Sequence, residues 1–381
     1  MQVPFVSLER QFRNLQGELV AAFERVGASG MYIMGEELER FEAEAGAYCG
    51  ARYALGVANG SDALFLILKA LAVGPGDEVI TCPNSFIASA WVIIAAGATP
   101  VFVDAAEDFN IDVRRIEAAV TPRTRAIIAV HLTGRPADMD AVNEIAGKHG
   151  LAVIEDAAQA IGARYKGRRV GSLGTAAGFS LHPLKNLGVY GDGGLVTTND
   201  RAIYDRIAKL RNHGLRNRDE CEIWGYNSRL DPLQAAFASV KLKRLDSWNA
   251  RCREIASRYR DGLADLVWVP RDRNHEEPVY HNFIIRLDQR DRLIEQLARC
   301  GVGSRVHYPI PIHLQECARH LGHREGDFPE AERQARTILS LPIYPEMTEP
   351  EIVASSTIRR TSASICAMVC SEMPNCLSRS R

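Results

Sequence analysis

Residues 153–159 read Val-Ile-Glu-Asp-Ala-Ala-Gln, and residues 179–188 read Phe-Ser-Leu-His-Pro-Leu-Lys-Asn-Leu-Gly. The first stretch ends an apolar strand with Asp156, at the edge where open α/β sheets hold their ligands. The second places Lys185 at a turn just after a short apolar strand. An amine that forms a Schiff base and a carboxylate that keeps a pyridine nitrogen protonated are what pyridoxal phosphate (PLP) chemistry requires. Because a single lysine after a strand is usually a solvated surface group, the inference depends on the residues around it.

A candidate anion site follows the apolar strand around Ala54. Residues 59–64, Asn-Gly-Ser-Asp-Ala-Leu, open a strongly apolar helix. Gly60 lets the backbone approach a ligand closely, Ser61 offers a hydroxyl, and the helix N-terminus supplies free N–H groups, which suits a phosphate. An ordinary capped turn between a strand and a helix would read the same way. Phe86, after another strand and turn, could stack on a flat ring or lie in the core.

The region from Tyr53 to Asn199 alternates short apolar strands with helices. Strands are predicted near Ala54, Val79, Val101, Ile127, Ile154, Phe179 and Leu195, and helices near 61–72, 85–96, 112–119 and 138–149. This alternation predicts an α/β fold with a mostly parallel central sheet and helices on both faces.

The flanking regions suggest two further units. An amphipathic N-terminal helix is predicted with one apolar stripe, formed by Leu8, Phe12, Leu15, Leu19 and Phe23. Asp231 and Pro232 read as an N-cap and a first helical residue, and that helix is predicted to run to about Ala264. A strand over 280–287 and a helix over 290–300 follow. We therefore predict a large PLP-binding domain over 1–245 and a smaller C-terminal α+β domain over 246–353. Residues 354–381, rich in Ser, Arg and Cys, are predicted to form a disordered, atypical tail.

Composition narrows the partners. A formal net charge of −1 over 381 residues gives no electrostatic case for nucleic acid or an anionic membrane. The most apolar stretch, around 86–98, is shorter than the ~20 residues that a membrane span needs, and no signal-like run opens the chain. The nine cysteines include no Cys-x-x-Cys pair, so reduced thiols and no metal are expected. The protein is predicted to be cytoplasmic.

Two classes of nucleotide-binding enzyme are disfavoured by the sequence. A nicotinamide dehydrogenase would need Gly-x-Gly-x-x-Gly after the first strand, and residues 57–62 read Val-Ala-Asn-Gly-Ser-Asp. A P-loop would need to end in Lys-Ser or Lys-Thr, which residues 162–168 lack.

Taken together, the motifs resemble the DegT/DnrJ/StrS sugar aminotransferases, a group of fold-type-I PLP enzymes. The resemblance runs from about Val3 to about Val353. The matching stretches are 59–64, 74–80, 97–104, 155–162, 180–194, 211–214, 225–231, 306–309 and 340–342.

The resemblance implies roles for individual residues. Lys185 would carry PLP as an aldimine, Asp156 would hold the pyridinium nitrogen, and Gln159 would contact the ring hydroxyl. Gly60, Ser61 and Ser180 match phosphate-binding positions, and Phe86 matches the ring that stacks on PLP. Asn227 matches a residue that reaches the phosphate of the neighbouring subunit, which implies a homodimer with shared active sites.

The implied reaction moves an amino group from L-glutamate to a keto-sugar, generally nucleotide-linked, through pyridoxamine phosphate. Acceptor-pocket candidates are His182, Tyr190, His213, Arg229, His307, Tyr308 and His313. Residues 305–313 hold a single arginine, Arg305, among His and Tyr, which favours a hydroxyl-rich ring over a second dicarboxylate. Two alternatives stay open: a PLP-dependent sugar dehydratase-like enzyme, although such relatives carry His where this chain has Lys185, and a non-catalytic PLP-binding regulator.

Overall fold

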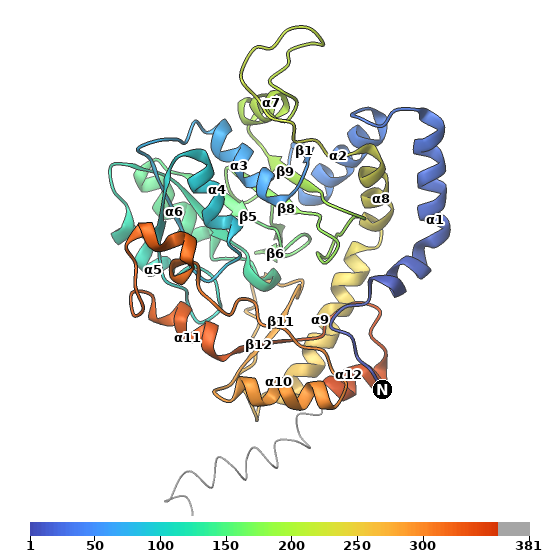
Figure 1. Cartoon of the computed structure of the whole chain (residues 1–381), viewed down its shortest axis with the longest axis vertical. Coiled ribbons are helices and arrows are strands. Elements are labelled where there is room, and N and C mark those ends of the chain that lie inside the picture. The colour runs from blue at the N-terminus through green and yellow to red at the C-terminus, as the bar shows by residue number, and fades with distance from the viewer. Residues whose placement is uncertain (357–381) are drawn as a thin grey trace, which may run out of the picture.

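The computed structural model describes residues 1–356, in which a seven-stranded sheet forms the centre of the molecule (Figure 1). In spatial order the strands are β1 (Tyr53–Val57), β9 (Gly194–Thr198), β8 (Ala176–Ser180), β5 (Ala152–Asp156), β4 (Thr124–Val130), β2 (Glu78–Thr81) and β3 (Thr99–Phe102). Only β9 runs antiparallel to its neighbours in this sheet. The predicted α/β fold with a mostly parallel sheet is confirmed.

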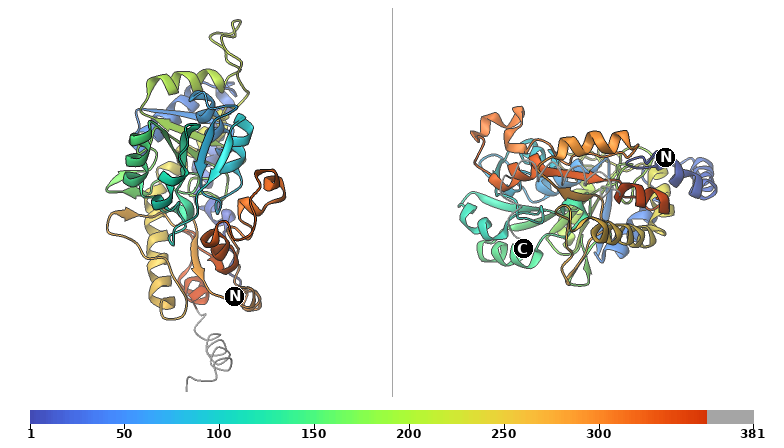
Figure 2. Two further views of the ribbon diagram at one scale, coloured as in Figure 1. Left: turned by 90° about the vertical axis from the view of Figure 1, so that its left-hand side faces the viewer. Right: turned by 90° about the horizontal axis from the view of Figure 1, so that it is seen from below.

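Both faces of the sheet are buried, because successive residues of each strand enter different core clusters. Ile127 and Val153 lie in one cluster, whereas Ile128 and Ile154 lie in the other. The first cluster is covered by α2 (Glu36–Cys49), α6 (Met139–His149) and α8 (Pro232–Leu242), and the second by α3 (Gly60–Ala70), α4 (Ala88–Ala96) and α7 (Arg201–Leu210). Helices lie on both sides of the sheet when it is viewed from the side (Figure 2).

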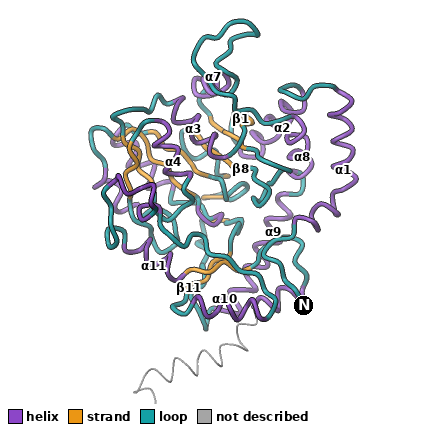
Figure 3. The backbone as a smooth tube through the Cα atoms, in the orientation of Figure 1, coloured by secondary structure: helices purple, strands orange, loops and turns teal. Residues whose placement is uncertain are grey.

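A second unit packs at the other end of the chain. The antiparallel strands β11 (Phe283–Arg286) and β12 (Ile338–Leu341) form its sheet, and α9 (Leu245–Leu263), α10 (Arg290–Arg299) and α12 (Glu349–Ser356) surround it (Figure 3). Tyr259, Phe283 and Leu339 share its core with Val3, which pairs with Val302. The N-terminal residues thus belong to this core, and a domain boundary at 245 stays a prediction.

The remaining elements are short. They are α5 (Val113–Ile116), α11 (Pro329–Thr337), a three-stranded sheet of β10 (Glu276–Glu277), β6 (Arg164–Tyr165) and β7 (Arg168–Arg169), and four single-turn or two-turn 3₁₀ helices over 117–119, 132–134, 312–314 and 316–321. The predicted tail from 354 overlaps α12 by three residues, and its remainder, 357–381, lies outside the described residues.

One predicted helix is wrong in its length. The element expected over 231–264 is two helices, α8 and α9, separated at Lys243 and Arg244. No Gly or Pro marks the break. It arises from packing, since α8 lies against α1 and α2 whereas α9 lies against α12.

The apolar stripe of the N-terminal helix α1 (Leu8–Ser29) is also partly wrong. Leu15 and Leu19 are buried as expected, but they are joined by Ala22 and Val26. Phe12 and Phe23 are 39% and 58% exposed, and Leu8 is exposed as well. The face that meets α8 is therefore displaced toward the C-terminus of the helix, and three large apolar side chains stay on the surface.

Residues 1–356 contain neither a membrane-spanning helix nor a cluster of metal ligands. No helix in this range is long and apolar enough to cross a bilayer. Nor do three or more His, Cys, Asp or Glu side chains gather there in a way that could hold a metal ion.

Candidate active site

Adjacent strand ends bring the predicted carboxylate and amine to one edge of the sheet. Asp156 is the last residue of β5 and pairs in register with Gly178 of β8. The turn that carries Lys185 leaves β8 two residues after Gly178, at Ser180. Residues that are 29 positions apart in the sequence numbering, 156 and 185, are therefore neighbours at the carboxyl end of parallel strands, where α/β folds bind ligands.

The carboxylate of Asp156 is held in one orientation. Asp156 is only 5% exposed, and its Oδ2 accepts a hydrogen bond from Ser89 Oγ at 2.6 Å. Oδ1 accepts a second bond from the Ala158 backbone N–H at 3.2 Å. Ser89 belongs to α4 and is buried, so the carboxylate is fixed from a second element. A buried, oriented carboxylate is suited to pairing with a cationic ring nitrogen.

Lys185 is held on a tight turn. Its backbone N–H donates to the His182 carbonyl at 2.8 Å, and Val189 N–H donates to the Leu181 carbonyl at the same distance. Burial lowers the pKa of the Lys185 ammonium to about 8, although the nearby Asp156 carboxylate acts in the opposite direction. The ammonium still predominates near neutral pH, but the neutral amine that Schiff-base chemistry requires is far more populated than in an ordinary lysine.

The turn before α3 touches the start of the lysine turn. A Cβ placed on Gly60 would lie 2.7 Å from Ser180 Cβ and 2.9 Å from Ser180 Cα. The Asn59 side chain caps α3 by accepting from Asp62 N–H at 2.8 Å, and a Cβ on Gly194 would lie 2.2 Å from the Asn59 carbonyl oxygen. Only glycine fits at both contacts. The N-terminus of α3 and the Ser180 hydroxyl therefore meet in one small concave space that suits a phosphate.

Aromatic and amide groups form the opposite wall. The rings of Phe86 and Tyr308 are 5.7 Å apart between centroids and tilted by 43°. Gln159 Nε2 donates to the Tyr308 hydroxyl at 3.3 Å, and Gln159 Oε1 accepts from the Thr133 backbone N–H at 2.7 Å. Burial raises the pKa of Tyr308, and the charge of Asp156 adds to the shift. The phenol therefore stays protonated as a hydrogen-bond donor.

Two neutral histidines stand near the amine. Burial lowers the pKa of His307 to about 4, and Lys185 and then Arg305 add to the shift. Burial also holds the pKa of His281 well below its usual range, with further contributions from Lys185 and His307. His307 Nδ1 lies 2.9 Å from Ser340 Oγ. Uncharged imidazoles beside Lys185 add hydrogen-bonding groups without adding positive charge.

Sequence reasoning missed Ser89, Thr133 and His281. Ser89 reads as a small residue in an apolar helix, and Thr133 contributes only its backbone N–H, so neither leaves a pattern. His281 lies inside the predicted strand 280–287, two residues before the observed β11, and a histidine in that stretch was an available signal.

Other predicted site residues lie elsewhere within the chain. Tyr190 contacts Phe12, Phe237 and Lys241, Arg229 donates to Asn212 Oδ1 at 3.0 Å, and buried His313 lies 3.1 Å from Glu332. His213 and Asn227 lie on the loop after α7, and Asn227 is exposed and bridges Asn212 through the backbone. His182 is exposed beside the lysine turn, and Ser61 is half-buried in the first turn of α3.

The group of residues fits PLP. The Gly60–Ser180 contact leaves no room for a side chain at the anion site, Asp156 presents an oriented carboxylate, and Lys185 supplies an amine of lowered pKa. PLP carries an aldehyde, a pyridine nitrogen and a phosphate, which match these three groups in turn.

The chain is similar to known proteins over most of its length. A model of the DegT/DnrJ/EryC1/StrS aminotransferase family matches residues 13–356. The dTDP-3-amino-3,4,6-trideoxy-alpha-D-glucose transaminase of Streptomyces venezuelae is 47% identical over 353 residues, which span 92% of this chain and 93% of that protein. A protein of Geobacillus stearothermophilus named pleiotropic regulatory protein is 46% identical over 356 residues, or 92% and 96% of the two chains. The crystal structure of S. venezuelae DesV in complex with a ketimine intermediate has a TM-score of 0.93 at 46% identity, covering 95% of this chain and 98% of that one.

Proposed function

Because the chain belongs to the DegT/DnrJ/EryC1/StrS aminotransferase family, we propose that it transfers an amino group from L-glutamate to a nucleotide-linked keto-sugar. The chain is a PLP-dependent aminotransferase. The finer assignment of the acceptor draws its main support from the S. venezuelae relative, which is named for an amino-sugar linked to dTDP and is 47% identical over nearly the whole chain.

PLP, when bound, supplies an electron sink for the Cα atom of the amino donor. We assign its attachment to Lys185 and the protonation of its ring nitrogen to Asp156. With the cofactor and the amino donor bound, the Lys185 amine would act as the base that takes the proton from the donor Cα. Its lowered pKa, about 8, supports this role, because a much larger fraction of Lys185 than of an ordinary lysine is a neutral base near neutral pH.

The binding roles of the other groups follow from their positions. Gly60, Ser61 and Ser180 hold the phosphate at the N-terminus of α3, Phe86 stacks on the ring, and Gln159 contacts the ring hydroxyl. The support is the close contact of Gly60 with Ser180 and the placement of Phe86 and Gln159 around Tyr308.

We place the acceptor sugar against His182, His307 and Tyr308. The last two side chains present an imidazole and a phenol, neutral at pH 7, beside the lysine, and such groups hydrogen-bond sugar hydroxyls without demanding a second carboxylate. Tyr190, Arg229 and His313 stay predictions that contacts within one chain do not support.

A homodimer with shared sites is part of the proposal. The loop after α7 projects from the body of the molecule (Figure 1) and carries Trp224, which is 95% exposed, and the exposed Asn227. Exposed Phe12 and Phe23 on α1 add apolar surface of the kind that a second subunit covers. We assign Asn227 to the phosphate of the partner's PLP.

Mixing two inactive variants tests the shared site. Lys185→Ala lacks the amine and Asn227→Ala lacks the partner's phosphate ligand, so a mixed dimer contains one site with neither change. Subunit exchange should therefore restore activity that each variant lacks alone. No recovery after demonstrated exchange would contradict a shared site.

The acceptor is tested by competition. Enzyme first converted by L-glutamate to the amino form of its cofactor is offered 3-keto and 4-keto nucleotide-sugars, oxaloacetate and pyruvate. Return of the original cofactor absorption should be faster with one of the sugars than with either keto acid. The opposite ranking would overturn the sugar assignment.

The relative named as a regulatory protein raises the alternative of a non-catalytic role. Lys185 and Asp156 are both present here, whereas a chain that only binds PLP needs neither proton transfer nor a charged ring nitrogen. Multiple turnovers with glutamate and a keto-sugar would exclude that alternative.

A further inference from the structure

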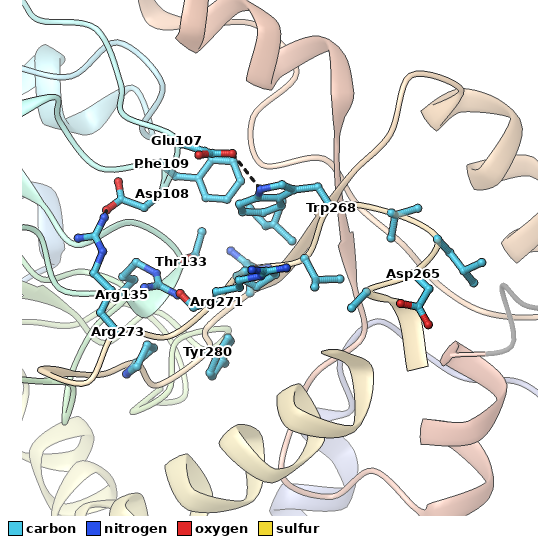
Figure 4. Close-up of a pocket in the computed structure, with 18 residues that line it drawn as sticks. Glu107, Asp108, Phe109, Thr133, Arg135, Asp265, Trp268, Arg271, Arg273 and Tyr280 are labelled. Atoms are coloured by element: carbon cyan, nitrogen blue, oxygen red, sulfur yellow. Dashed lines mark hydrogen bonds and ion pairs between the residues drawn. The ribbon is translucent and has the colours of Figure 1, made fainter. Parts of the chain in front are cut away.

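A cavity separate from the lysine turn lies between the part of the chain that forms the seven-stranded sheet and the small C-terminal unit. It has a volume of about 680 Å³, and its walls come from residues 107–109, 133–135 and 264–284 (Figure 4). Lys185, Asp156, Phe86 and Gln159 are not among the residues that line it. Its volume lies within the range of ~300–1,000 Å³ that is typical of small-molecule sites.

Most charged groups of the cavity have an ion-pair partner, either in the wall or just behind it. Arg273 lies 2.8 Å from Asp108, and Arg135 lies 3.1 Å from Asp272. Arg271 differs, because its guanidinium makes no ion pair or hydrogen bond with any side chain of residues 1–356. In the view of Figure 4, Arg271 lies between Trp268 above and Tyr280 below. An unpaired guanidinium is a fork of donors suited to a carboxylate or a phosphate.

A flat apolar surface completes the cavity. The indole N–H of Trp268 donates to Glu107 Oε1 at 3.1 Å (Figure 4). The Arg286 guanidinium carbon lies 3.8 Å from the indole centroid, and the Phe109 ring meets the indole edge-on at 5.4 Å. The indole is therefore fixed on three sides, and a rigid aromatic wall favours a planar ligand because little side-chain freedom is lost on binding.

We propose that this cavity binds a small aromatic anion, whose carboxylate or phosphate pairs with Arg271 while its ring packs on Trp268. Within residues 1–356 the Asp265 side chain also makes no ion pair or hydrogen bond, and it is drawn at the opposite side of the cavity from Arg135 and Arg273 (Figure 4). The anionic end of the ligand accordingly lies at the arginine side. The assignment is independent of the proposed function, because no residue assigned to the cofactor or to the acceptor sugar lines this cavity.

Titration of the PLP-loaded enzyme with benzoate and with phenyl phosphate tests the proposal. Calorimetry gives the affinity, and a change in intrinsic tryptophan fluorescence shows whether the probe binds beside Trp268. Phenol, which has the ring but no anionic group, and inorganic phosphate, which has the anionic group but no ring, serve as control ligands. Saturable binding is expected for at least one aromatic anion, and the tighter of the two identifies the anion as carboxylate or phosphate. Trp268→Phe should remove the fluorescence change, whereas Trp224→Phe should retain it.

The decisive variant is Arg271→Gln, with Arg206→Gln as the matched control. Both arginines are exposed and lack a partner in the described chain, but Arg206 lies on α7, away from the cavity. Arg271→Gln should weaken binding at least ~10-fold and the control should leave it unchanged. Equal affinity in wild type and Arg271→Gln, or no saturable binding of either aromatic anion up to ~10 mM, would overturn the proposal.

Discussion

Adding one methyl group at Gly60 should weaken PLP binding. The new Cβ would lie 2.7 Å from Ser180 Cβ and 2.9 Å from Ser180 Cα. Because one of these atoms is backbone, the contact cannot be relieved by rotating a side chain. The turn before α3 and the start of the lysine turn must move apart, and both supply groups to the proposed phosphate site.

The size of the effect follows from that overlap. Inserting a methyl group into a closely packed position costs ~1–3 kcal/mol. If the displacement is felt at the phosphate, the dissociation constant of PLP rises about 5- to 150-fold. The measurement is a PLP titration of cofactor-free Gly60→Ala enzyme, followed by absorbance.

Gly147→Ala is the matched control. Gly147 lies within helix α6 and has nothing within 4 Å of its ideal Cβ, so alanine should stabilise the helix by up to ~1 kcal/mol and leave PLP binding unchanged. A dissociation constant for Gly60→Ala within about twofold of that control would refute the placement of the phosphate.

Three further outcomes are expected. Asp156→Asn should retain PLP but raise the barrier of the glutamate half-reaction by at least ~3 kcal/mol, measured in single turnovers, because the ring nitrogen loses its counter-charge; near-normal turnover would contradict the role of Asp156. In cofactor-free enzyme the neutral Lys185 amine is the nucleophile and its pKa is about 8, so stopped-flow capture of PLP should accelerate up to that pH and then level off; a rate that still climbs between pH 9 and 10 would exclude a lowered pKa. Burial likewise lowers the pKa of Lys241 to about 8, while the unfolded chain keeps that proton until about pH 10.5. Because the unfolded state then binds more protons, stability should rise with pH between 8 and 10, and urea unfolding of Lys241→Met should show a smaller rise than wild type.

The sheet could be read from the sequence because its strands are continuous apolar runs bounded by turns. Strand β5 ends at Asp156 as predicted, and the alternation of strands with helices fixes a mostly parallel sheet. The family resemblance read from the motifs is confirmed across residues 13–356. Where packing rather than pattern decides, the reading was wrong, as at Lys243 and Arg244, where one expected helix is two.

The cofactor-binding assignments could be made from sequence, but the residues that position them could not. Ser89 lies 67 positions before Asp156, and Thr133 reaches Gln159 only through its backbone. Such contacts depend on how α4 and the loop after β4 close on the sheet, and no local pattern encodes that closure. The same holds for Arg271, because its lack of an ion-pair partner within residues 1–356 becomes visible only in the folded chain.

The central claim is that Lys185 carries the cofactor, and one measurement tests it most directly. The enzyme is reduced with borohydride, digested, and searched by mass spectrometry for the peptide that carries a pyridoxyl group. The modified peptide should contain Lys185, and treatment with L-glutamate before reduction should remove the modification, because the cofactor then leaves the lysine. A pyridoxyl group on any other lysine, or an equal yield of adduct in Lys185→Ala, would contradict this account of the site.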